Sequence, residues 1–399
     1  MSARPGLSAT SAAVAATAAA VAGAVAARAG GRAAVARVER RLNPVAAPPP
    51  YAVSERARQV HAAATVVDLH ADPLLWGRDL LERGSRGHVD VPRLLEGNVA
   101  LEVFAAPTKS PRHLNIERND DRSDDITALA VARGWPPTTW RSLTARALHL
   151  GRQLEATARR SNGTLTLVRS AADLEAFLAR RADNPALVAG LLAIEGAHAV
   201  GQDLAGLDAI EAAGFRMVGL AHFFDNVVAG SAHGVAKGGL TALGRELVAE
   251  LEGRRIIVDL AHSSRATIDD VLTLAQRPLV ASHTGVRGIA DNARNLPDEQ
   301  LRGIAATGGM VGIGFWPTAC GGDNAAAIAR SIAYAASVAA IDHVGLGSDF
   351  DGGVAVPFDA SGMALLTQAL LEEGLDEASI AKVMGDNAIR VLRAALPPG

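Results

Sequence analysis

The stretch TVVDLHADPLLW, residues 65–76, begins as an apolar run and then carries two polar side chains, His70 and Asp72, just before Pro73. Its β-branched and aliphatic residues are typical of a buried strand. Side chains two residues apart on a strand point to the same face, so His70 and Asp72 are placed to bind one ligand together. The stretch therefore predicts a buried strand with a ligand-binding pair of side chains at its C-terminal end.

Seven further apolar runs share this character, and amphipathic helical patterns lie between them. The runs occupy residues 98–106, 186–196, 214–223, 255–263, 278–285, 309–315 and 343–352. Near-continuously apolar strands that alternate with helices indicate a parallel sheet covered on both faces. Eight such units predict an α/β protein with a closed (β/α)8 TIM-type barrel. An open doubly wound sheet is the alternative, but no glycine-rich phosphate-binding fingerprint follows the first strand.

The composition of the chain changes along its length. Residues 5–27 are uncharged and mostly alanine, and the proline-rich stretch VAAPPP follows at 45–50. We expect residues 1–50 to form an Ala-rich N-terminal segment with a Pro-rich linker. Residues 51–399 are then expected to form the barrel, with a helical insertion at about 107–185.

The Ala-rich segment bears on location. Its uncharged run is long enough to cross a bilayer, and AVA at 24–26 resembles a leader-cleavage site. Alanine is only weakly hydrophobic, however, so a plain soluble extension of a cytoplasmic protein is the competing interpretation. The arginines that follow the run would keep an anchored barrel in the cytoplasm, whereas a cleaved leader would export it.

Composition excludes several classes of function. The 399-residue chain is 49% hydrophobic and has a formal net charge of -3, so it can bury a large core and has no basic field to attract nucleic acid. Its single cysteine, Cys320, excludes an intrachain disulfide and a cysteine-based metal cage. Metal chemistry would therefore depend on the 11 histidines and on carboxylates.

Six of the predicted strands break their apolar pattern at the C-terminal end. The residues found there are His70 and Asp72, Glu195, His222, His262, His283 and Asp349. In a barrel these ends meet at the rim that builds the active site. Imidazole and carboxylate ligands without thiolate suit zinc or a similar divalent ion. This many candidates exceeds the needs of one tetrahedral zinc, which favours two metals that share a carboxylate.

Seven motifs resemble, in order, those of the membrane (renal) dipeptidase family, peptidase family M19: HAD, IEG, LAH, DLAHSS, ASHTG, ADNARNLPDE and GLGSDFDGG. The resemblance runs from residue 65 to about residue 395. It implies a metallo-dependent hydrolase-like barrel with two Zn²⁺ ions. His70, Asp72 and Glu195 would hold one ion, and Glu195, His262 and His283 the second.

The same resemblance implies roles for three further residues. His222 would bind the scissile carbonyl or the tetrahedral intermediate, Arg294 the substrate carboxylate, and Asp349 would transfer the proton. Phe223 and Phe224 follow His222 in place of a small polar residue, so we expect the substrate pocket to differ from that of relatives.

Three neighbours of these motifs are given plainer interpretations. Asp351 competes with Asp349 for the proton role, and the family resemblance favours Asp349. Asp259, three residues before His262, is expected to be structural or to orient a ligand. His233 in SAHGVAKGG is expected to be an exposed loop histidine, with substrate contact as the alternative.

Together these parts predict a binuclear zinc dipeptidase that hydrolyses dipeptides with a free C-terminal carboxylate. Two divalent ions roughly 3.5–4 Å apart lower the pKa of a bridging water toward about 7, which supplies a metal-bridging hydroxide. His222 then stabilises the oxyanion, and Asp349 moves the proton to the leaving amine.

Alternatives come from other classes. Another amidohydrolase-type enzyme, such as a deaminase or lactonase, would show His-x-His on the first strand and a metal-bridging lysine on the fourth, and this sequence has neither. A non-catalytic metal-binding barrel would show a broken ligand set. We expect a dipeptide as the small-molecule partner and no nucleic acid. Membrane association through residues 5–27 and a homodimer are kept as hypotheses.

Overall fold

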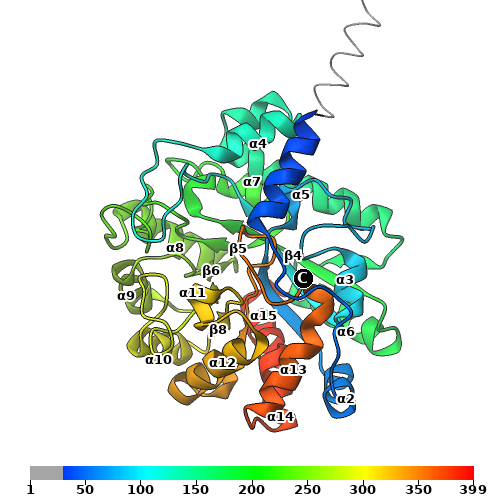
Figure 1. The fold of residues 1–399 in the computed structure, drawn as a ribbon. Helices are drawn as coiled ribbons and strands as arrows, with labels where there is room; N and C mark the ends of the chain where they lie inside the picture. Colours follow the sequence, from blue (N-terminus) through cyan, green and yellow to red (C-terminus); the bar gives the residue numbers. More distant parts are fainter. Residues whose placement is uncertain (1–29) are drawn as a thin grey trace, which may run out of the picture.

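Eight parallel strands close into a barrel in the computed structural model, which describes residues 30–399 (Figure 1). The strands are β1 (Val66–Ala71), β2 (Val99–Pro107), β4 (Val188–Glu195), β5 (Phe215–Gly219), β6 (Ile257–Asp259), β7 (Val280–Thr284), β8 (Met310–Ile313) and β9 (Val344–Leu346). Each strand pairs with the next, β2 pairs with β4, and β9 pairs with β1, which closes the ring. Each of the eight coincides with a predicted apolar run, although β2 ends one residue beyond its run, at Pro107. The (β/α)8 prediction is therefore confirmed, and the open doubly wound alternative is wrong.

The strands are covered on both faces. Every residue of β1, β2, β4 and β7 is buried, including those that alternate in direction along the strand. This burial explains why the runs are almost continuously apolar rather than alternating.

Helices form the outer layer. They are α2 (Glu55–Ala63), α3 (Val91–Glu96), α7 (Leu207–Ala212), α8 (Ala242–Gly253), α9 (Arg265–Leu274), α10 (Asp298–Ala306), α11 (Pro317–Cys320), α12 (Ala325–Ala339), α13 (Met363–Glu372), α14 (Glu377–Ala381) and α15 (Asn387–Ala395). Thr241, Ser264 and Asn324 cap α8, α9 and α12, because each side chain accepts a hydrogen bond from a backbone N–H of the first turn.

The connection between β2 and β4 is the longest in the barrel. It contains α4 (Asp125–Arg133), α5 (Leu143–Arg160) and α6 (Ala171–Asp183), within the 107–185 stretch for which we expected helices. It also contains a short strand that we did not predict, β3 (Leu165–Leu167), which pairs with the first residues of β4. Three residues give too little periodic signal to be recognised as a strand.

The described part of the N-terminal segment lies against the barrel. Residues 30–42 are helical (dark blue in Figure 1), and their Val35 and Glu39 side chains are buried. The Glu39 carboxylate accepts a hydrogen bond of 2.6 Å from Arg78 Nε and pairs with Arg86. These contacts begin before Tyr51, where we expected the folded domain to start.

The membrane hypothesis concerns residues 5–27, which lie outside the described residues. Among residues 30–399, no helix combines the length and the apolar character needed to cross a membrane.

Candidate metal centre

The structure brings the predicted polar residues together at one end of the barrel. His70 and His283 lie within β1 and β7, and Glu195 is the last residue of β4. Asp72, His222, His262 and Asp349 lie in the loops that directly follow β1, β5, β6 and β9. All of these side chains are buried. Parallel strands place their C-terminal ends on the same rim, so groups from the ends of six strands converge.

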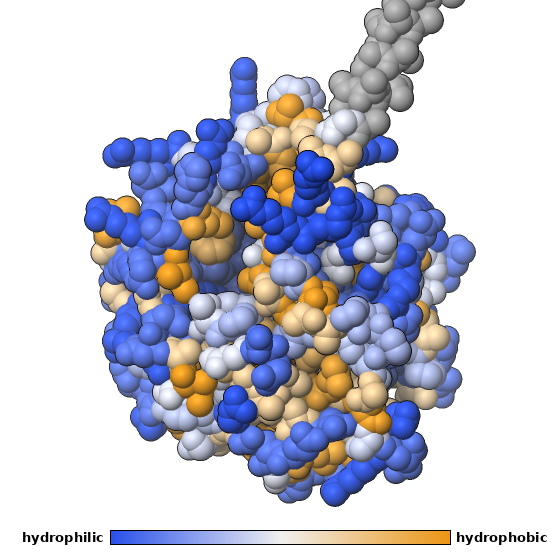
Figure 2. Space-filling model, viewed as in Figure 1, coloured by the Kyte–Doolittle hydropathy of each residue, from blue (hydrophilic) through white to orange (hydrophobic). Residues whose placement is uncertain are grey.

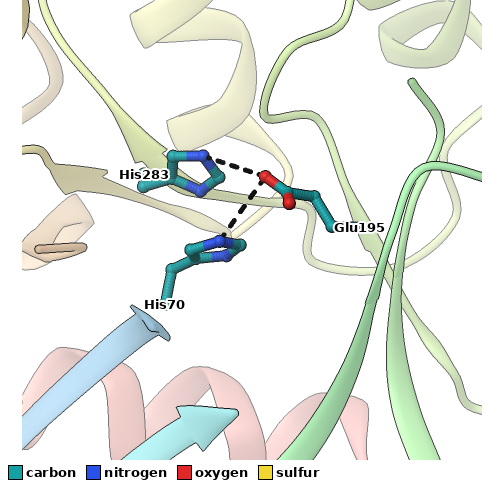
Figure 3. Close-up of side chains that lie close together, drawn as sticks. All are labelled: His70, Glu195 and His283. Atoms are coloured by element: carbon teal, nitrogen blue, oxygen red, sulfur yellow. Dashed lines mark ion pairs between the residues drawn. The ribbon is translucent and has the colours of Figure 1, made fainter. Parts of the chain in front are cut away.

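Glu195 is the hub of the cluster. Its Oε1 lies 3.1 Å from His262 Nε2, 3.5 Å from His70 Nε2 and 3.6 Å from His283 Nε2. Its Oε2 lies 3.2 Å from His222 Nε2. Figure 3 shows the carboxylate pointing between the rings of His70 and His283. Four imidazoles from four strand ends therefore face one carboxylate.

A second carboxylate-rich group adjoins this hub. His70, Asp72 and Asp349 offer ligand atoms that lie within 4.8 Å of one another. Burial favours a neutral His70 ring, but Asp72, and then Glu195 and Asp349, outweigh it and raise the pKa of His70 to about 10. Burial raises the pKa of Asp349 to about 7.

Two other compact groups of ligand atoms include Glu195. One joins His70, Glu195 and His283, and the other joins Glu195, His222 and His262. All five expected metal ligands belong to the three groups. His222 and Asp349, to which the family resemblance gives other roles, belong to them as well.

The hydrogen bonds of His283 fix which ring nitrogen faces Glu195. The Ser282 hydroxyl donates to Asp259 Oδ2 at 2.6 Å and contacts His283 Nδ1 at 2.9 Å. A serine has one hydroxyl proton, so the Ser282 oxygen must accept the second bond from a protonated Nδ1. The lone pair of His283 then sits on Nε2, the atom that faces Glu195. This series of hydrogen bonds also explains the position of Asp259, which we expected to be structural or to orient a ligand.

His222 is oriented in the same way. Its Nδ1 lies 3.2 Å from the carbonyl oxygen of Lys109, which can only accept a hydrogen bond. The neutral His222 ring therefore also turns a lone pair toward Glu195.

The carboxylate oxygens and imidazole nitrogens of this cluster are suited to bind a divalent cation. Without a cation these ligand atoms repel one another, because imidazole lone pairs and a carboxylate meet in a buried space. His262 Nε2, for example, lies 2.9 Å from His283 Nε2. Burial and then Asp72 raise the pKa of Glu195 well above its usual value, and burial lowers the pKa of both His262 and His283. A cation held among nitrogen and carboxylate ligands would remove this conflict.

Backbone strain marks the same loops. His262 has a φ of 61° and Asp349 a φ of 60°, in the left-handed region that residues with side chains rarely adopt. Such strain persists where the surroundings hold the residue in place, and it gathers at functional sites.

Arg294 lies beside the cluster. It is buried, donates from Nη2 to the carbonyl oxygen of His283, and its guanidinium lies 5.8 Å from the ring centroid of Trp316. Burial lowers its pKa to about 10, while Asp349, Asp259 and Glu195 oppose that shift. Its charge is thus available close to the cluster.

His233 belongs to the site, although we expected an exposed loop residue. Only 2% of its surface is exposed, and its ring lies 5.2 Å from that of His262 and 5.1 Å from that of Phe223. Its Nδ1 bonds to the Ile116 carbonyl at 2.7 Å, whereas Nε2 is buried without a partner. The exposed reading of His233 was wrong, because a segment more than one hundred residues away covers the loop.

The fold and the site define a metal-binding (β/α)8 barrel. The model of the membrane dipeptidase family, peptidase family M19, matches residues 54–396. The chain belongs to this family, and it is a metallo-dipeptidase of the hydrolase class.

Similar proteins agree with this assignment. Dipeptidase tcpJ of Claviceps purpurea is 28% identical over 319 residues, which cover 77% of this chain and 69% of that protein. The crystal structure of dipeptidase AC, a family M19 metallopeptidase, has a TM-score of 0.69 and 28% identity, and the match covers 83% of this chain and 99% of that one. A metallopeptidase from Rhodobacter sphaeroides, bound to a phosphinate mimic of L-Ala-D-Ala, has a TM-score of 0.68 and 27% identity over 83% of this chain and 99% of its own.

Proposed function

We propose that this protein is a binuclear zinc dipeptidase that cleaves dipeptides with a free C-terminal carboxylate. The observation that carries the proposal is the position of Glu195, whose two oxygens face the Nε2 atoms of four histidines. One carboxylate with two oxygens can join two cation sites.

The ligand sets follow the family resemblance. His70, Asp72 and Glu195 would hold one ion, and Glu195, His262 and His283 the other. When bound, such ions supply a water nucleophile at neutral pH and polarise the scissile carbonyl. Ser282 keeps the His283 lone pair directed at the site, and a ligand oriented in this way holds its metal more tightly.

Asp349 is assigned the proton transfer. It would accept the proton that the attacking water loses as the new C–O bond forms. It would then deliver that proton to the amine nitrogen as the C–N bond breaks. Its proximity to His70 and Asp72 places it beside the proposed metal ligands.

His222 is assigned to the carbonyl oxygen of the scissile bond. Because Nδ1 is held by the Lys109 carbonyl, Nε2 can donate a hydrogen bond only when the ring carries both protons. Burial lowers the pKa of His222 well below its usual value, so the ring would take up its second proton only as negative charge develops on the substrate oxygen. The protonated ring would stabilise the negative charge that develops on the oxygen.

Arg294 is assigned to the substrate carboxylate, which its guanidinium can bind through two parallel hydrogen bonds. This contact would restrict the enzyme to very short peptides, because a longer chain has no carboxylate at that distance. The relative bound to a mimic of L-Ala-D-Ala supports a dipeptide substrate and a D residue at its C-terminal position.

Metal analysis with a substrate panel tests the proposal. The purified full chain should contain two equivalents of zinc and hydrolyse L,L and L,D dipeptides. C-terminal amidation should abolish turnover, because it removes the group that Arg294 binds. Hydrolysis of lactones or deamination in place of peptide cleavage, or full metal content without any turnover, would contradict it.

We also propose that residues 5–27 attach the protein to a membrane or direct its export, and that the barrel forms a homodimer. The uncharged Ala-rich run supports the first of these proposals. Cell fractionation of the full chain and of a chain that begins at residue 30 tests it, and recovery of the full chain in the soluble cytoplasmic fraction would contradict it. Light scattering of the purified protein tests the homodimer.

A further inference from the structure

An arginine-lined cavity lies where the N-terminal helix meets the barrel. It has a volume of about 590 Å³, and five arginines line it: Arg32, Arg78, Arg86, Arg133 and Arg160. It is built by residues 30–42, by the loop after β1 and by helices α4 and α5. None of the residues of the metal centre lines it. Figure 2 shows hydrophilic side chains gathered over the end of the helical segment that reaches the barrel.

Three of these arginines have carboxylate partners. Arg78 pairs with Glu39 and Asp351, Arg86 pairs with Glu39, and Arg160 pairs with Asp79. Their charges are therefore matched within the protein.

The other two, Arg32 and Arg133, have no carboxylate partner among residues 30–399. Residues 1–29 contain no Asp or Glu that could provide one. Arg133 donates only to neutral oxygens, at 2.7 Å to Leu75 O, 3.1 Å to Leu74 O and 3.4 Å to Gln153 Oε1. Burial lowers its pKa to about 10, Glu39 opposes that shift, and the nearby Arg32 lowers the pKa further.

An unpaired donor lies next to Arg133. Gln153 also lines the cavity, and its Nε2 is buried with no hydrogen-bond partner. A buried amide donor without a partner costs free energy. Two guanidinium groups without a carboxylate partner and one amide donor without an acceptor thus line the same space.

We propose that this cavity is a binding site for a phosphate ester. A phosphate group can accept from two guanidinium groups and an amide at once, and arginine matches its geometry with paired donors. The volume is in the range of small-ligand sites and exceeds what phosphate alone would fill. Val35, Trp76 and Ala156 provide apolar walls for the rest of the ester.

The same chemistry could come from a soluble metabolite or from a phospholipid headgroup. The cavity lies against residues 30–42, which directly follow the Ala-rich segment, so a headgroup would be within reach if that segment attaches the protein to a membrane, as proposed above. The experiment therefore uses a soluble probe and a vesicle probe.

Calorimetric titration with sn-glycerol 3-phosphate tests the site in the full chain. Arg32→Glu and Arg133→Gln should each weaken binding by roughly tenfold or more, as expected for loss of a charge-assisted hydrogen bond. Arg37→Glu is the matched control, because Arg37 is exposed on the same helix and does not line the cavity. It should leave the affinity unchanged.

Vesicles of phosphatidylglycerol, with phosphatidylcholine as the neutral reference, identify the source. Vesicle binding that glycerol 3-phosphate displaces would assign the site to a headgroup, and binding of the soluble ester alone would assign it to a metabolite. The proposal is overturned if the ester does not bind saturably, if malonate binds as tightly, or if Arg37→Glu weakens binding as much as Arg32→Glu. Arg32→Glu keeps the test valid even if Arg133→Gln fails to fold, because Arg32 is exposed.

Discussion

Two buried carboxylates in the loop after β9 have opposite surroundings. Asp351 receives hydrogen bonds from the backbone N–H groups of His88 at 2.7 Å and Val89 at 3.1 Å, and it pairs with Arg78. Asp349, two residues earlier, instead faces His70 and Asp72. Asp349 and Asp351 are buried to a similar degree, so they differ in the hydrogen-bond donors around them. Hydrogen-bond donors of the chain itself thus satisfy the Asp351 carboxylate, whereas the Asp349 carboxylate faces groups that could share a cation with it.

The largest effect should come from Glu195→Gln. The amide keeps the shape of the side chain but removes the charge that two cation sites would share. We expect turnover to fall by at least about 10³-fold, since metal ions supply several kcal/mol of transition-state stabilisation. Metal content by mass spectrometry and dipeptide turnover are the measurements.

Glu102→Gln is the matched control for Glu195→Gln. Glu102 is a buried glutamate on the neighbouring strand β2, neither of its carboxylate oxygens has a partner, and burial raises its pKa well above the usual value. Glu102 belongs to none of the three groups of ligand atoms, so the amide should change metal content and turnover little. Equal losses in both variants would show that a general loss of folding explains the first.

Asp351→Asn should act on stability and leave the metal in place. Removal of one partner of a buried ion pair costs about 3–5 kcal/mol of unfolding free energy. Asp349→Asn should show the reverse pattern, with turnover lost and stability retained. Urea denaturation and zinc content measure the two effects. Loss of zinc in Asp351→Asn without loss of stability would contradict the prediction that Asp351 supports stability and Asp349 supports turnover.

Arg78 and Arg294 differ in the same way as the two carboxylates, because only one of them is paired within the protein. Arg78 contacts two carboxylates, whereas Arg294 has no ion pair among the described residues and would bind the substrate. Arg294→Lys removes the paired donors, so kcat/KM for a dipeptide should fall by about 10²-fold. The fall should appear mainly in KM. A variant that still discriminates fully against amidated dipeptides would contradict the assignment.

The smallest effect is expected at Ser282. Ser282→Ala removes the bond that orients His283, and loss of such an outer partner lowers metal affinity by about 10–100-fold. Ser263→Ala is the control, because Ser263 follows a proposed ligand but its hydroxyl is buried without a partner. Zinc affinity measured by chelator competition should respond to the first variant only.

The sequence predicts the barrel and the convergence of its polar strand ends well. Both depend on local patterns, since an apolar run defines each strand and the parallel arrangement brings the ends to one rim. His70, Asp72 and Glu195 could be placed in this way because each ends an apolar run. The family resemblance was needed to divide the ligands between two ions and to prefer Asp349 over Asp351.

Contacts across long separations could not be predicted. Asp351 is paired within the protein because Arg78, 273 residues earlier, reaches it. His233 is buried because the segment around Ile116 covers it, 117 residues away. The Ser282 bond to Asp259 depends on the register of β6 against β7 and leaves no local pattern. The helix at residues 30–42 packs through Glu39, whose partners lie on another loop.

Anomalous diffraction at the zinc edge, from crystals of the full chain grown with zinc, tests the central claim most directly. We predict two peaks roughly 3.5–4 Å apart, with one Glu195 oxygen about 2.0–2.2 Å from each ion. A single peak, or two peaks of which neither contacts Glu195, would contradict the account.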